Sequence, residues 1–264
     1  MTDLTFDPSR LGPEAGSYVA VAGGCGGMGR VLVNALLKTG VNVAVLDMQT
    51  SITQNPPPPE ALTLAIDGSD AVSVENAFAE LANQWPHLDG FVNLIGFFKG
   101  WSQVSELPVD IFDEVISGNL RSHFLCARAA LPMLRNSTSG SLVNVSSTLG
   151  IDVVKHYSHY SAAKAGVIAL TKGMARENGE HVRVNAIAPG LSNTAFLTGG
   201  TGRDKLFDGI DPEYYGKMVP MKRMAEAEDM TGPILFLLGK ASAFVNGETL
   251  IVDGGMYDEM DTSR

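Results

Sequence analysis

The chain has 264 residues, of which 45% are hydrophobic and 18% are charged, and this suits one α/β domain with a large buried core. The formal net charge of −10 argues against binding to nucleic acid or to acidic membranes through bulk electrostatics. No apolar run approaches the ~20 residues that a membrane-spanning helix needs, and residues 1–8 lack the basic start and apolar core of a signal peptide. We therefore expect a cytoplasmic protein without membrane or nucleic-acid partners.

The chain contains two cysteines, Cys25 and Cys126, and neither stands in a metal-ligand pattern. The sequence therefore predicts no metal site. A disulfide between the two is left open by the sequence, but reduced thiols are the expectation for a cytosolic protein.

The first expected unit is a strand, a glycine-rich turn and a helix. The apolar run 17–22 leads into the turn 23–29, GGCGGMG, and a helical run follows at 30–38. Glycines allow a tight turn and let the backbone approach a pyrophosphate, while the helix N-terminus supplies free N–H groups. The alternative is a flexible glycine loop, and the strand that follows at 41–47 argues against it.

That next strand, residues 41–47, ends in Asp47, eighteen residues after Gly29. A dinucleotide-binding unit needs a carboxylate at this point for the adenosine ribose hydroxyls. The same carboxylate would repel a 2′-phosphate, and no Arg or Lys lies in 23–29 or at 48–49 to attract one. The pattern favours NAD over NADP.

Strands and helices continue to alternate to the end of the chain. Further strands are expected at 62–66, 88–95, 142–147, 181–188 and 249–253, and helices at 69–83, 108–134 (one long helix or two) and 157–178. Such alternation predicts a parallel sheet covered on both faces, within a single domain 1–264. The stiff proline run 56–59 predicts a shortened crossover that lacks a helix. Residues 191–220 are rich in Gly, Asp and Thr, and a segment of that length is usually a lid or disordered.

The segment Tyr160-Ser-Ala-Ala-Lys164 carries candidate acid–base chemistry. Residues four apart on a helix share a face, so Lys164 can act on the phenol of Tyr160. A free phenol has a pKa of about 10, and a nearby ammonium favours the phenolate and lowers that value. Ser147 ends the strand-like run 142–147 and could place a hydroxyl against the same reacting oxygen. Such a Tyr–Lys pair occurs by chance as a surface pair, so its weight depends on the glycine turn upstream.

Taken together, these motifs resemble the short-chain dehydrogenase/reductase family over nearly the whole chain. The turn has the family spacing Gly23-x-x-x-Gly27-x-Gly29, and Pro189-Gly190-x-x-x-Thr194 follows the Tyr–Lys segment in the family order. The resemblance implies a Rossmann fold, with a doubly wound seven-stranded parallel sheet and helices on both faces.

The resemblance also assigns residues to roles. The catalytic residues would be Asn119, Ser147, Tyr160 and Lys164. The cofactor-binding residues would be Gly23, Gly27, Met28, Gly29, Asp47, Asp67, Gly68, Asn93, Gly96, Tyr160, Lys164, Pro189, Gly190 and Thr194. The chain departs from the family pattern at Ala22, where a Thr is usual, and at Leu94 and Ile95, which replace the second Asn and the Ala of the Asn-Asn-Ala-Gly element.

The function that the resemblance implies is hydride transfer between NAD and a small-molecule secondary alcohol or ketone, with Tyr160 as general acid/base. It also implies a homotetramer (or dimer), assembled through 118–134, 157–178 and 249–253, and a substrate lid at 191–220. One alternative is an epimerase or dehydratase, although the chain leaves no room for the larger substrate domain that those enzymes often carry. The other is a non-catalytic NAD-binding regulatory or scaffold protein.

Aromatic residues after the fourth strand suggest a cyclic or aromatic substrate, although ordinary loop packing explains them equally well. The candidate substrate-contacting residues are Phe97, Phe98, Trp101, Leu149 and His156. His159 is expected to be a surface or capping residue, because helical geometry turns it away from the face that carries Tyr160.

Overall fold

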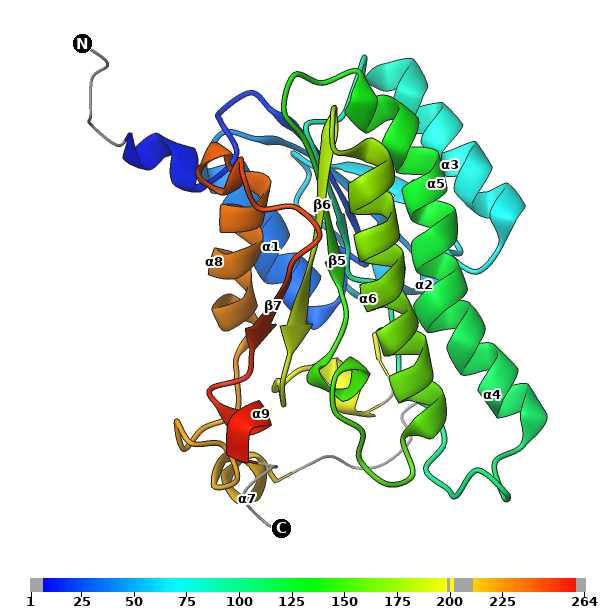
Figure 1. The fold of residues 1–264 in the computed structure, drawn as a ribbon. Coiled ribbons are helices and arrows are strands. Elements are labelled where there is room, and N and C mark those ends of the chain that lie inside the picture. The colour runs from blue at the N-terminus through cyan, green and yellow to red at the C-terminus, as the bar shows by residue number, and fades with distance from the viewer. Residues whose placement is uncertain (1–6, 199, 202–210, 260–264) are drawn as a thin grey trace.

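The chain enters its sheet near the middle and then extends it in both directions. The structure, a computed structural model, describes residues 7–198, 200–201 and 211–259. Within these ranges seven parallel strands form one sheet in the order β3-β2-β1-β4-β5-β6-β7 (Figure 1). The strands are β1 (Tyr18–Ala22), β2 (Asn42–Asp47), β3 (Leu62–Ala65), β4 (Gly90–Asn93), β5 (Gly140–Val145), β6 (Val182–Pro189) and β7 (Thr249–Val252). Because β2 and β4 lie on opposite sides of β1, the crossovers diverge there, and sheets of this kind bind ligands at the carboxyl ends of the strands beside that point.

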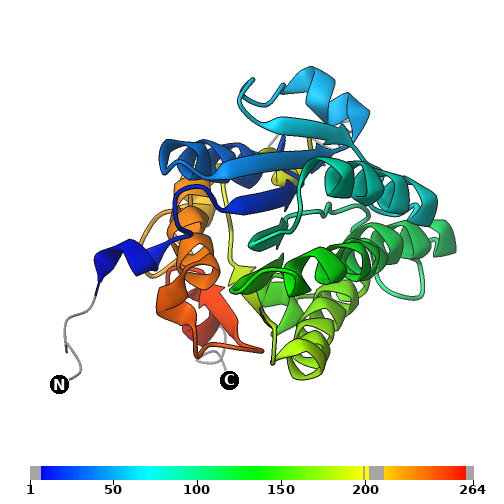
Figure 2. The ribbon, with the colours of Figure 1, turned by 90° about the horizontal axis from the view of Figure 1, so that it is seen from above.

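Helices cover both faces of the twisted sheet (Figure 2). They are α1 (Gly27–Lys38), α2 (Gln49–Gln54), α3 (Ala71–Gln84), α4 (Val109–Ile116), α5 (Ser122–Arg135), α6 (Ser158–Asn178), α7 (Pro212–Gly216), α8 (Ala227–Leu238) and α9 (Met256–Glu259). Helices α1 and α8 pack on one face, and α3, α5 and α6 pack on the other. The predicted doubly wound architecture is confirmed.

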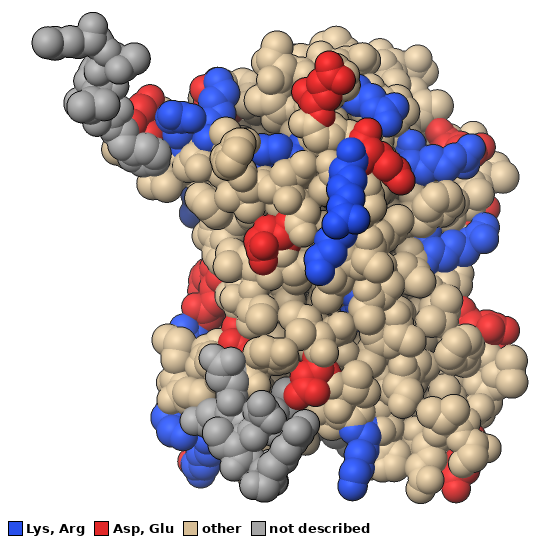
Figure 3. All heavy atoms as spheres, viewed as in Figure 1, with Lys and Arg blue, Asp and Glu red and all other residues tan. Residues whose placement is uncertain are grey.

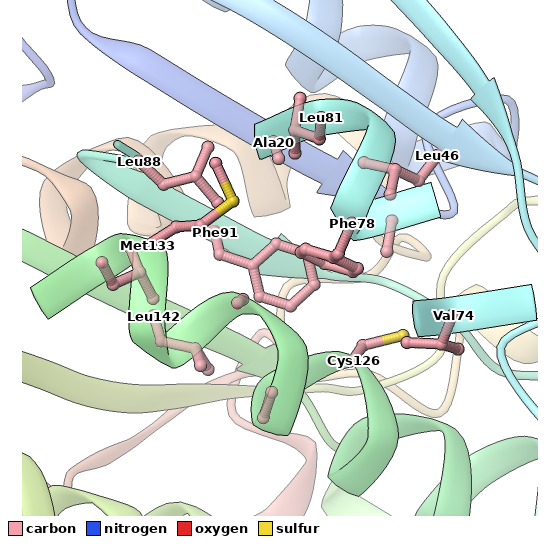
Figure 4. Close-up of a cluster of buried hydrophobic side chains, with 14 of the residues drawn as sticks. Ala20, Leu46, Val74, Phe78, Leu81, Leu88, Phe91, Cys126, Met133 and Leu142 are labelled. Carbon is pink, nitrogen blue, oxygen red and sulfur yellow. The ribbon is translucent and has the colours of Figure 1, made fainter. Parts of the chain in front are cut away.

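Side-chain alternation along the strands divides the interior into two cores. Successive strand residues point to opposite faces, so Ala20 of β1 lies in the core under α3 and α5, while Val21 lies in the core under α1 and α8. In the first core the rings of Phe91 and Phe78 meet edge-on with their centroids 5.6 Å apart (Figure 4). Burying one such side chain completely stabilises the fold by about 1.5–3 kcal/mol.

Cys25 and Cys126 are both free and buried, and they lie in different cores. The sheet stands between them, so no disulfide can join them. Within the described ranges no cluster of His, Cys, Asp or Glu is arranged to hold a metal ion, and none of the described helices is long and apolar enough to cross a membrane. Charged side chains of both signs are scattered over the face seen in Figure 3, with broad uncharged areas between them.

Two crossovers differ from the sequence-based expectation. The six-residue helix α2 stands between β2 and the proline run 56–59, so the prolines follow a short helix instead of replacing it. The region 108–134 is a continuous helical run in which a π-helical turn, Ser117–Arg121, separates α4 from α5. Turns of this kind are frequent at functional sites.

The fourth strand is shorter than predicted, and its last residue explains why. β4 ends at Asn93, whose side-chain oxygen accepts a hydrogen bond of 3.2 Å from the backbone N–H of Ile95. This side-chain contact replaces the next ladder bond and turns the chain away from the sheet. The loop that follows, beginning at Gly96, lines the cavity described next.

Candidate functional site

A cavity of about 780 Å³ extends along the carboxyl ends of the strands. It is within the size range of pockets for small molecules and cofactors. One end, called here the Asp47 end, is lined by Asp47, Met48, Ser51, Asp67 and Gly68. The other, called the aromatic end, is lined by Phe97, Phe98, Trp101, Leu149, Val154, Tyr157, Phe196, Tyr215, Met218 and Tyr257. Ser147, Tyr160 and Lys164 lie between the two ends.

Three glycines of the turn stand where a side chain would be strained or would meet neighbouring atoms. Gly23 has a φ of 82°, in the left-handed region that favours glycine. A Cβ on Gly29, at the start of α1, would collide with the carbonyl oxygen of Gly23, and a Cβ on Gly27 would come within 3.0 Å of Thr194. The turn therefore keeps backbone close to the cavity, as a pyrophosphate site at a helix N-terminus requires.

Asp47 is 9% exposed at the end of β2 and is held by neighbouring backbone. One carboxylate oxygen accepts the N–H of Cys25 at 2.9 Å, and the other accepts the N–H of Met48 at 2.8 Å. Burial raises the pKa of Asp47, while these hydrogen bonds oppose the rise. Among the described residues that line the cavity, Lys164 is the one cation, and it lies away from the Asp47 end.

Ser147, Tyr160 and Lys164 converge where β5 ends against the start of α6. Ser147 lies beside Tyr160 on the cavity wall, where hydrogen bonding from its hydroxyl favours the phenolate and opposes the rise of the phenol's pKa. The ammonium nitrogen of Lys164 donates to the carbonyl of Val145 at 3.0 Å and lies 5.8 Å from the centroid of the Tyr160 ring. The packing is close, because a Cβ on Gly150 would lie 2.7 Å from the backbone carbon of Lys164.

The pKa of Tyr160 differs from the sequence-based expectation. The prediction was that Lys164 lowers it, but burial raises the pKa of Tyr160 and lowers that of Lys164 to about 7. In a buried site, removing a charged group from water costs free energy. Here that cost exceeds the attraction between Tyr160 and Lys164, because each of the two is largely neutral. The hydrogen bond from Ser147 acts in the opposite direction and favours the phenolate.

Asn119 lies in the π-helical turn and is fully buried behind the cavity. Its side-chain nitrogen donates to the carbonyls of Phe97 at 2.8 Å and Val115 at 3.0 Å, and its oxygen accepts the N–H of Phe97 at 3.2 Å. The amide thus fixes the loop after β4. Gly96 lies between Asn119 and Lys164, since a Cβ there would lie 2.8 Å from the Asn119 oxygen and 3.1 Å from the Lys164 nitrogen.

Besides Asn119, two of the predicted residues lie off the cavity wall. Asn93 is fully buried, its oxygen is used by Ile95, and its side-chain nitrogen has no hydrogen-bond partner among the described residues. His156 is not among the lining residues; its ring packs edge-on against Trp101 at 5.1 Å, and its φ is 71°. The remaining predicted cofactor and substrate residues line the cavity.

The prediction that His159 is a surface or capping residue is wrong. His159 is 2% exposed, and its Nε2 lies 2.7 Å from the carbonyl oxygen of Lys99. It does point away from Tyr160, as helical geometry requires, but the loop 97–101 covers it there. Lys99 itself pairs with Glu114 at 2.6 Å. His159 therefore anchors the loop that carries Phe98 and Trp101.

The structure adds two residues, His123 and Phe196, that the sequence did not single out. His123 of α5 is fully buried, and burial together with the nearby charge of Lys164 lowers its pKa well below the usual value. At the aromatic end, Tyr157 stacks on Phe98 with centroids 4.7 Å apart, and Phe196 packs against Tyr160 at 5.8 Å. The ring of Phe98 also meets Tyr160 edge-on at 5.9 Å. These rings come from segments that are far apart in the sequence, and only the fold brings them together.

The predicted lid at 191–220 is described in part. Residues 199 and 202–210 lie outside the described residues. The described part includes a short 3₁₀ turn, Ala195–Thr198, and α7, and it contributes Thr194, Phe196 and Tyr215 to the cavity wall. The described part of this segment, which forms the wall on this side, contains no named strand.

Known proteins resemble this chain over most of its length. A family model described as "Enoyl-(Acyl carrier protein) reductase", from the short-chain dehydrogenase/reductase group, matches residues 23–257. Levodione reductase of Leifsonia aquatica is 31% identical over 250 residues, covering 90% of this chain and 92% of the relative. The 2,5-dichloro-2,5-cyclohexadiene-1,4-diol dehydrogenase of Sphingobium indicum is 31% identical over 252 residues, covering 91% and 97%.

Solved structures agree with the sequence comparison. The crystal structure of levodione reductase has a TM-score of 0.82 and 30% sequence identity, and the match covers 93% of this chain and 99% of that one. An aldohexose dehydrogenase from Thermoplasma acidophilum has a TM-score of 0.85 at 24% identity. At this identity the similarity supports the fold alone. The predicted family is thereby confirmed: the chain belongs to the short-chain dehydrogenase/reductase family, whose oxidoreductases use a nicotinamide cofactor.

Proposed function

We propose that the protein is an NAD-dependent dehydrogenase/reductase that transfers a hydride between NAD and a secondary alcohol or ketone, with Tyr160 as general acid/base. The observation that carries the proposal is the convergence of Ser147, Tyr160 and Lys164 on one cavity whose other end is the glycine turn. The cavity thus offers a cofactor cradle and an acid–base group within one continuous space.

The residues of the cradle fit a dinucleotide. Backbone at Gly23, Gly27 and Gly29 approaches the cavity where side chains would block it, which suits a pyrophosphate beside α1. Thr194 borders Gly27, and Pro189 and Gly190 line the same wall. Asp67 and Gly68 line the Asp47 end, where the adenosine would lie.

Asp47 supports NAD as the cofactor. Its buried carboxylate would accept the ribose hydroxyls and repel a 2′-phosphate. No Lys or Arg of the described residues lines this end to receive a phosphate.

The chemistry follows from the residues around Tyr160. Ser147 and Tyr160 would bind the substrate oxygen between their hydroxyls, and Tyr160 would take the alcohol proton. NAD, when bound, supplies the hydride acceptor and a positive charge beside the phenol. Ser147 stabilises the oxygen as charge develops, because its hydroxyl is already oriented by the N–H of Leu149 at 3.1 Å.

Lys164 would act on Tyr160 through its charge. Its nitrogen donates to the carbonyl of Val145 and would also hold the nicotinamide ribose of a bound cofactor. With a pKa lowered to about 7, Lys164 gains or loses its proton near neutral pH, and this suits a group that relays a proton from the phenol. Asn119 would complete the relay from the π-helical turn.

A cyclic substrate fits the aromatic end best. Rings from three segments, at Phe98, Tyr157 and Phe196, surround the position beside Tyr160. One relative at 31% identity is named levodione reductase, and another at 31% identity is named as a dehydrogenase of a cyclohexadiene diol. Lys99 is paired with Glu114, so it offers no ready partner for an anionic group. We therefore favour an uncharged cyclic alcohol or ketone.

Assembly and location are proposals of the same kind. Exposed apolar side chains on α4, α5 and β7, including Phe112, Phe124, Leu250 and Ile251, favour a homotetramer or dimer in the cytoplasm. Light scattering checks this, and a purely monomeric particle would contradict it.

The test is a spectrophotometric screen that offers NAD and NADP in parallel with aliphatic, cyclic and aromatic secondary alcohols. NADH formation with cyclic alcohols, and little with NADP, is the expected result. Tight NAD binding without turnover of any alcohol or ketone would favour the alternative of a non-catalytic NAD-binding protein. Turnover with NADP alone would contradict the role of Asp47 and leave that of Tyr160 intact.

A further inference from the structure

The end of β5 holds Lys164 of α6 at two points, its ammonium and its main-chain carbonyl. The ammonium nitrogen donates to the carbonyl of Val145 at 3.0 Å. The hydroxyl of the next residue, Ser146, donates to the main-chain carbonyl of Lys164 at 2.8 Å. Ser147 follows directly and lines the cavity together with Tyr160. Three consecutive residues thus lie where the strand end meets the helix that carries the acid–base group.

Ser146 is itself fixed to the sheet. Its backbone N–H donates to the carbonyl of Ile187 in β6 at 2.8 Å, and the residue is 3% exposed. The side chain of Val145 lies in the core under α1 and α8, so the alternation of side chains turns Ser146 toward the opposite face, where α6 packs. The hydroxyl of Ser146 therefore extends from a rigid element.

A second buried hydrogen bond joins the same strand to the same helix. The side-chain nitrogen of Asn144 donates to the hydroxyl of Thr171 at 2.9 Å. Asn144 and Ser146 stand two positions apart on one face of the strand, and Thr171 and Lys164 stand seven positions apart, or about two turns, on the helix. Of these two contacts, the one from Ser146 lies at the end of α6 that carries Tyr160.

The peptide group of Lys164 is also packed closely by the turn after β5. A Cβ on Gly150 would lie 2.7 Å from the backbone carbon of Lys164 and 3.0 Å from its carbonyl oxygen. The 3₁₀ turn Thr148–Gly150 therefore approaches α6 as closely as a residue without a side chain allows. With Ser146 bonded to the same carbonyl, this peptide has little room to shift.

We propose that Ser146 is a positioning residue for the reaction, because its hydroxyl sets the distance between the strand end that carries Ser147 and the helix that carries Tyr160 and Lys164. This inference rests on the proposed role of Tyr160 as general acid/base. A carbonyl has two lone pairs, so that of Lys164 can accept the hydroxyl in addition to its helical hydrogen bond. The stem of a lysine is long and flexible, so the position of its ammonium depends on where its backbone is fixed.

The loss of the Ser146 hydroxyl should therefore affect the rate more than the fold. The helix keeps its own hydrogen bonds, but α6 becomes free to shift relative to Ser147. Small displacements of reacting groups lower rates strongly, because catalysis depends on their alignment. The glycine turn and Asp47, at the other part of the cavity, do not depend on this contact, so cofactor affinity should be retained.

The experiment compares Ser146→Ala with the unaltered protein, using NAD and the cyclic alcohol that is turned over fastest in the screen above. The kcat, counted per NADH-binding site so that unfolded molecules do not lower it, should fall roughly tenfold. The KM for the alcohol and the Kd for NADH should stay within about twofold, and the Tm should fall by only a few degrees. Ser146→Thr, which keeps a hydroxyl, should recover most of the kcat.

Two matched controls separate positioning from general packing. Ser161→Ala removes a buried hydroxyl of α6 that has no hydrogen-bond partner among the described residues. Thr171→Val removes the other hydrogen bond between β5 and α6, about two helical turns from Lys164. Thr171→Val should lower the Tm, and neither control should change kcat per NADH-binding site.

The outcomes distinguish this inference from the function on which it rests. If Tyr160→Phe abolishes turnover while Ser146→Ala leaves kcat unchanged, the inference is wrong and the role of Tyr160 stands. An equal fall of kcat in Thr171→Val would also overturn it, because the effect would then be one of general packing. Weaker NADH binding with unchanged kcat in Ser146→Ala would make Ser146 a cofactor contact instead. If Tyr160→Phe keeps a tenth or more of the rate, the proposed function is itself wrong.

Discussion

The two ends of the cavity are built from different kinds of side chain. At the Asp47 end the two oxygens of a buried carboxylate accept the backbone N–H groups of Cys25 and Met48, which stand at fixed positions. At the aromatic end, rings from loops on three crossovers meet one another, and Trp101 is 68% exposed. Preorganised hydrogen bonds suit a part of the ligand that is the same in every reaction. Packed rings select a ligand by its shape and tolerate changes in its substituents.

A second difference lies in the hydrogen bonds that hold the ionisable groups Asp47 and Lys164. The carboxylate of Asp47 accepts two backbone N–H groups, whereas the ammonium of Lys164 donates, among the described residues, to the carbonyl of Val145 alone. Burial accordingly brings the pKa of Lys164 to about 7. Backbone hydrogen bonds thus oppose the effect of burial on the pKa of Asp47, whereas burial dominates the pKa of Lys164.

Replacing the phenol of Tyr160 should have the largest effect. We expect Tyr160→Phe to lower kcat by at least about 100-fold, since general acid–base catalysis contributes on that scale or more. NADH binding, measured by fluorescence, should stay within about twofold, because the phenol hydroxyl is a minor part of the cofactor contact. Tyr157→Phe removes a neighbouring phenol and is the control. A Tyr160→Phe enzyme with a tenth or more of the original rate would refute the assignment.

Filling the glycine turn should disable the cofactor cradle. In Gly29→Ala the new methyl group would collide with the carbonyl of Gly23, so the turn must open. Cofactor affinity should fall by roughly 100-fold, with a lower Tm. Gly173→Ala is the control, since nothing lies within 4 Å of its Cβ and it stands inside α6, where Ala is favoured by up to about 1 kcal/mol. Unchanged cofactor affinity in Gly29→Ala would contradict this account of the turn.

Removing a ring at the aromatic end should change substrate preference and leave cofactor affinity unchanged. Phe98→Ala removes the ring that stacks on Tyr157 and meets Tyr160. We expect kcat/KM for a cyclic substrate to fall by roughly tenfold relative to a small aliphatic alcohol, which is the scale of a lost apolar contact. Phe112→Ala, an exposed ring on α4, is the control. An equal loss for both substrates would mean that Phe98 only supports the loop.

The pH dependence of stability should report on the centre of the cavity. The pKa of Lys164 is lowered from 10.5 to about 7, so between these values the unfolded chain holds a proton that the folded one has lost. The free energy of unfolding without cofactor should therefore rise with pH above about 7, by up to about 1.4 kcal/mol per pH unit. Below that pH both states hold the proton, so Lys164 adds no slope. Lys164→Met should remove that slope in urea titrations. A slope identical to that of the unaltered protein would contradict the lowered pKa.

Local patterns in the sequence were enough for the fold and for much of the site. The alternation of strands and helices predicts a doubly wound sheet, because each pattern depends on neighbouring residues. The glycine turn, Asp47 and the Tyr160–Lys164 pair are also local: their spacing along one strand, turn or helix determines how they point. For this reason residues that act within one element could be identified without the structure.

The tertiary structure decided how residues from different elements meet. His159 looked like a surface residue because its own helix leaves it free, and only the loop at Lys99, sixty positions away, covers it. One backbone donor to Asp47 comes from Cys25 in the turn before α1, and the side chain of Asn119 is bound to Phe97. Burial also reversed the expected shift at Tyr160. Periodicity in the sequence records which face of an element is apolar but not which element covers it, and the desolvation and hydrogen bonding of each group depend on that cover.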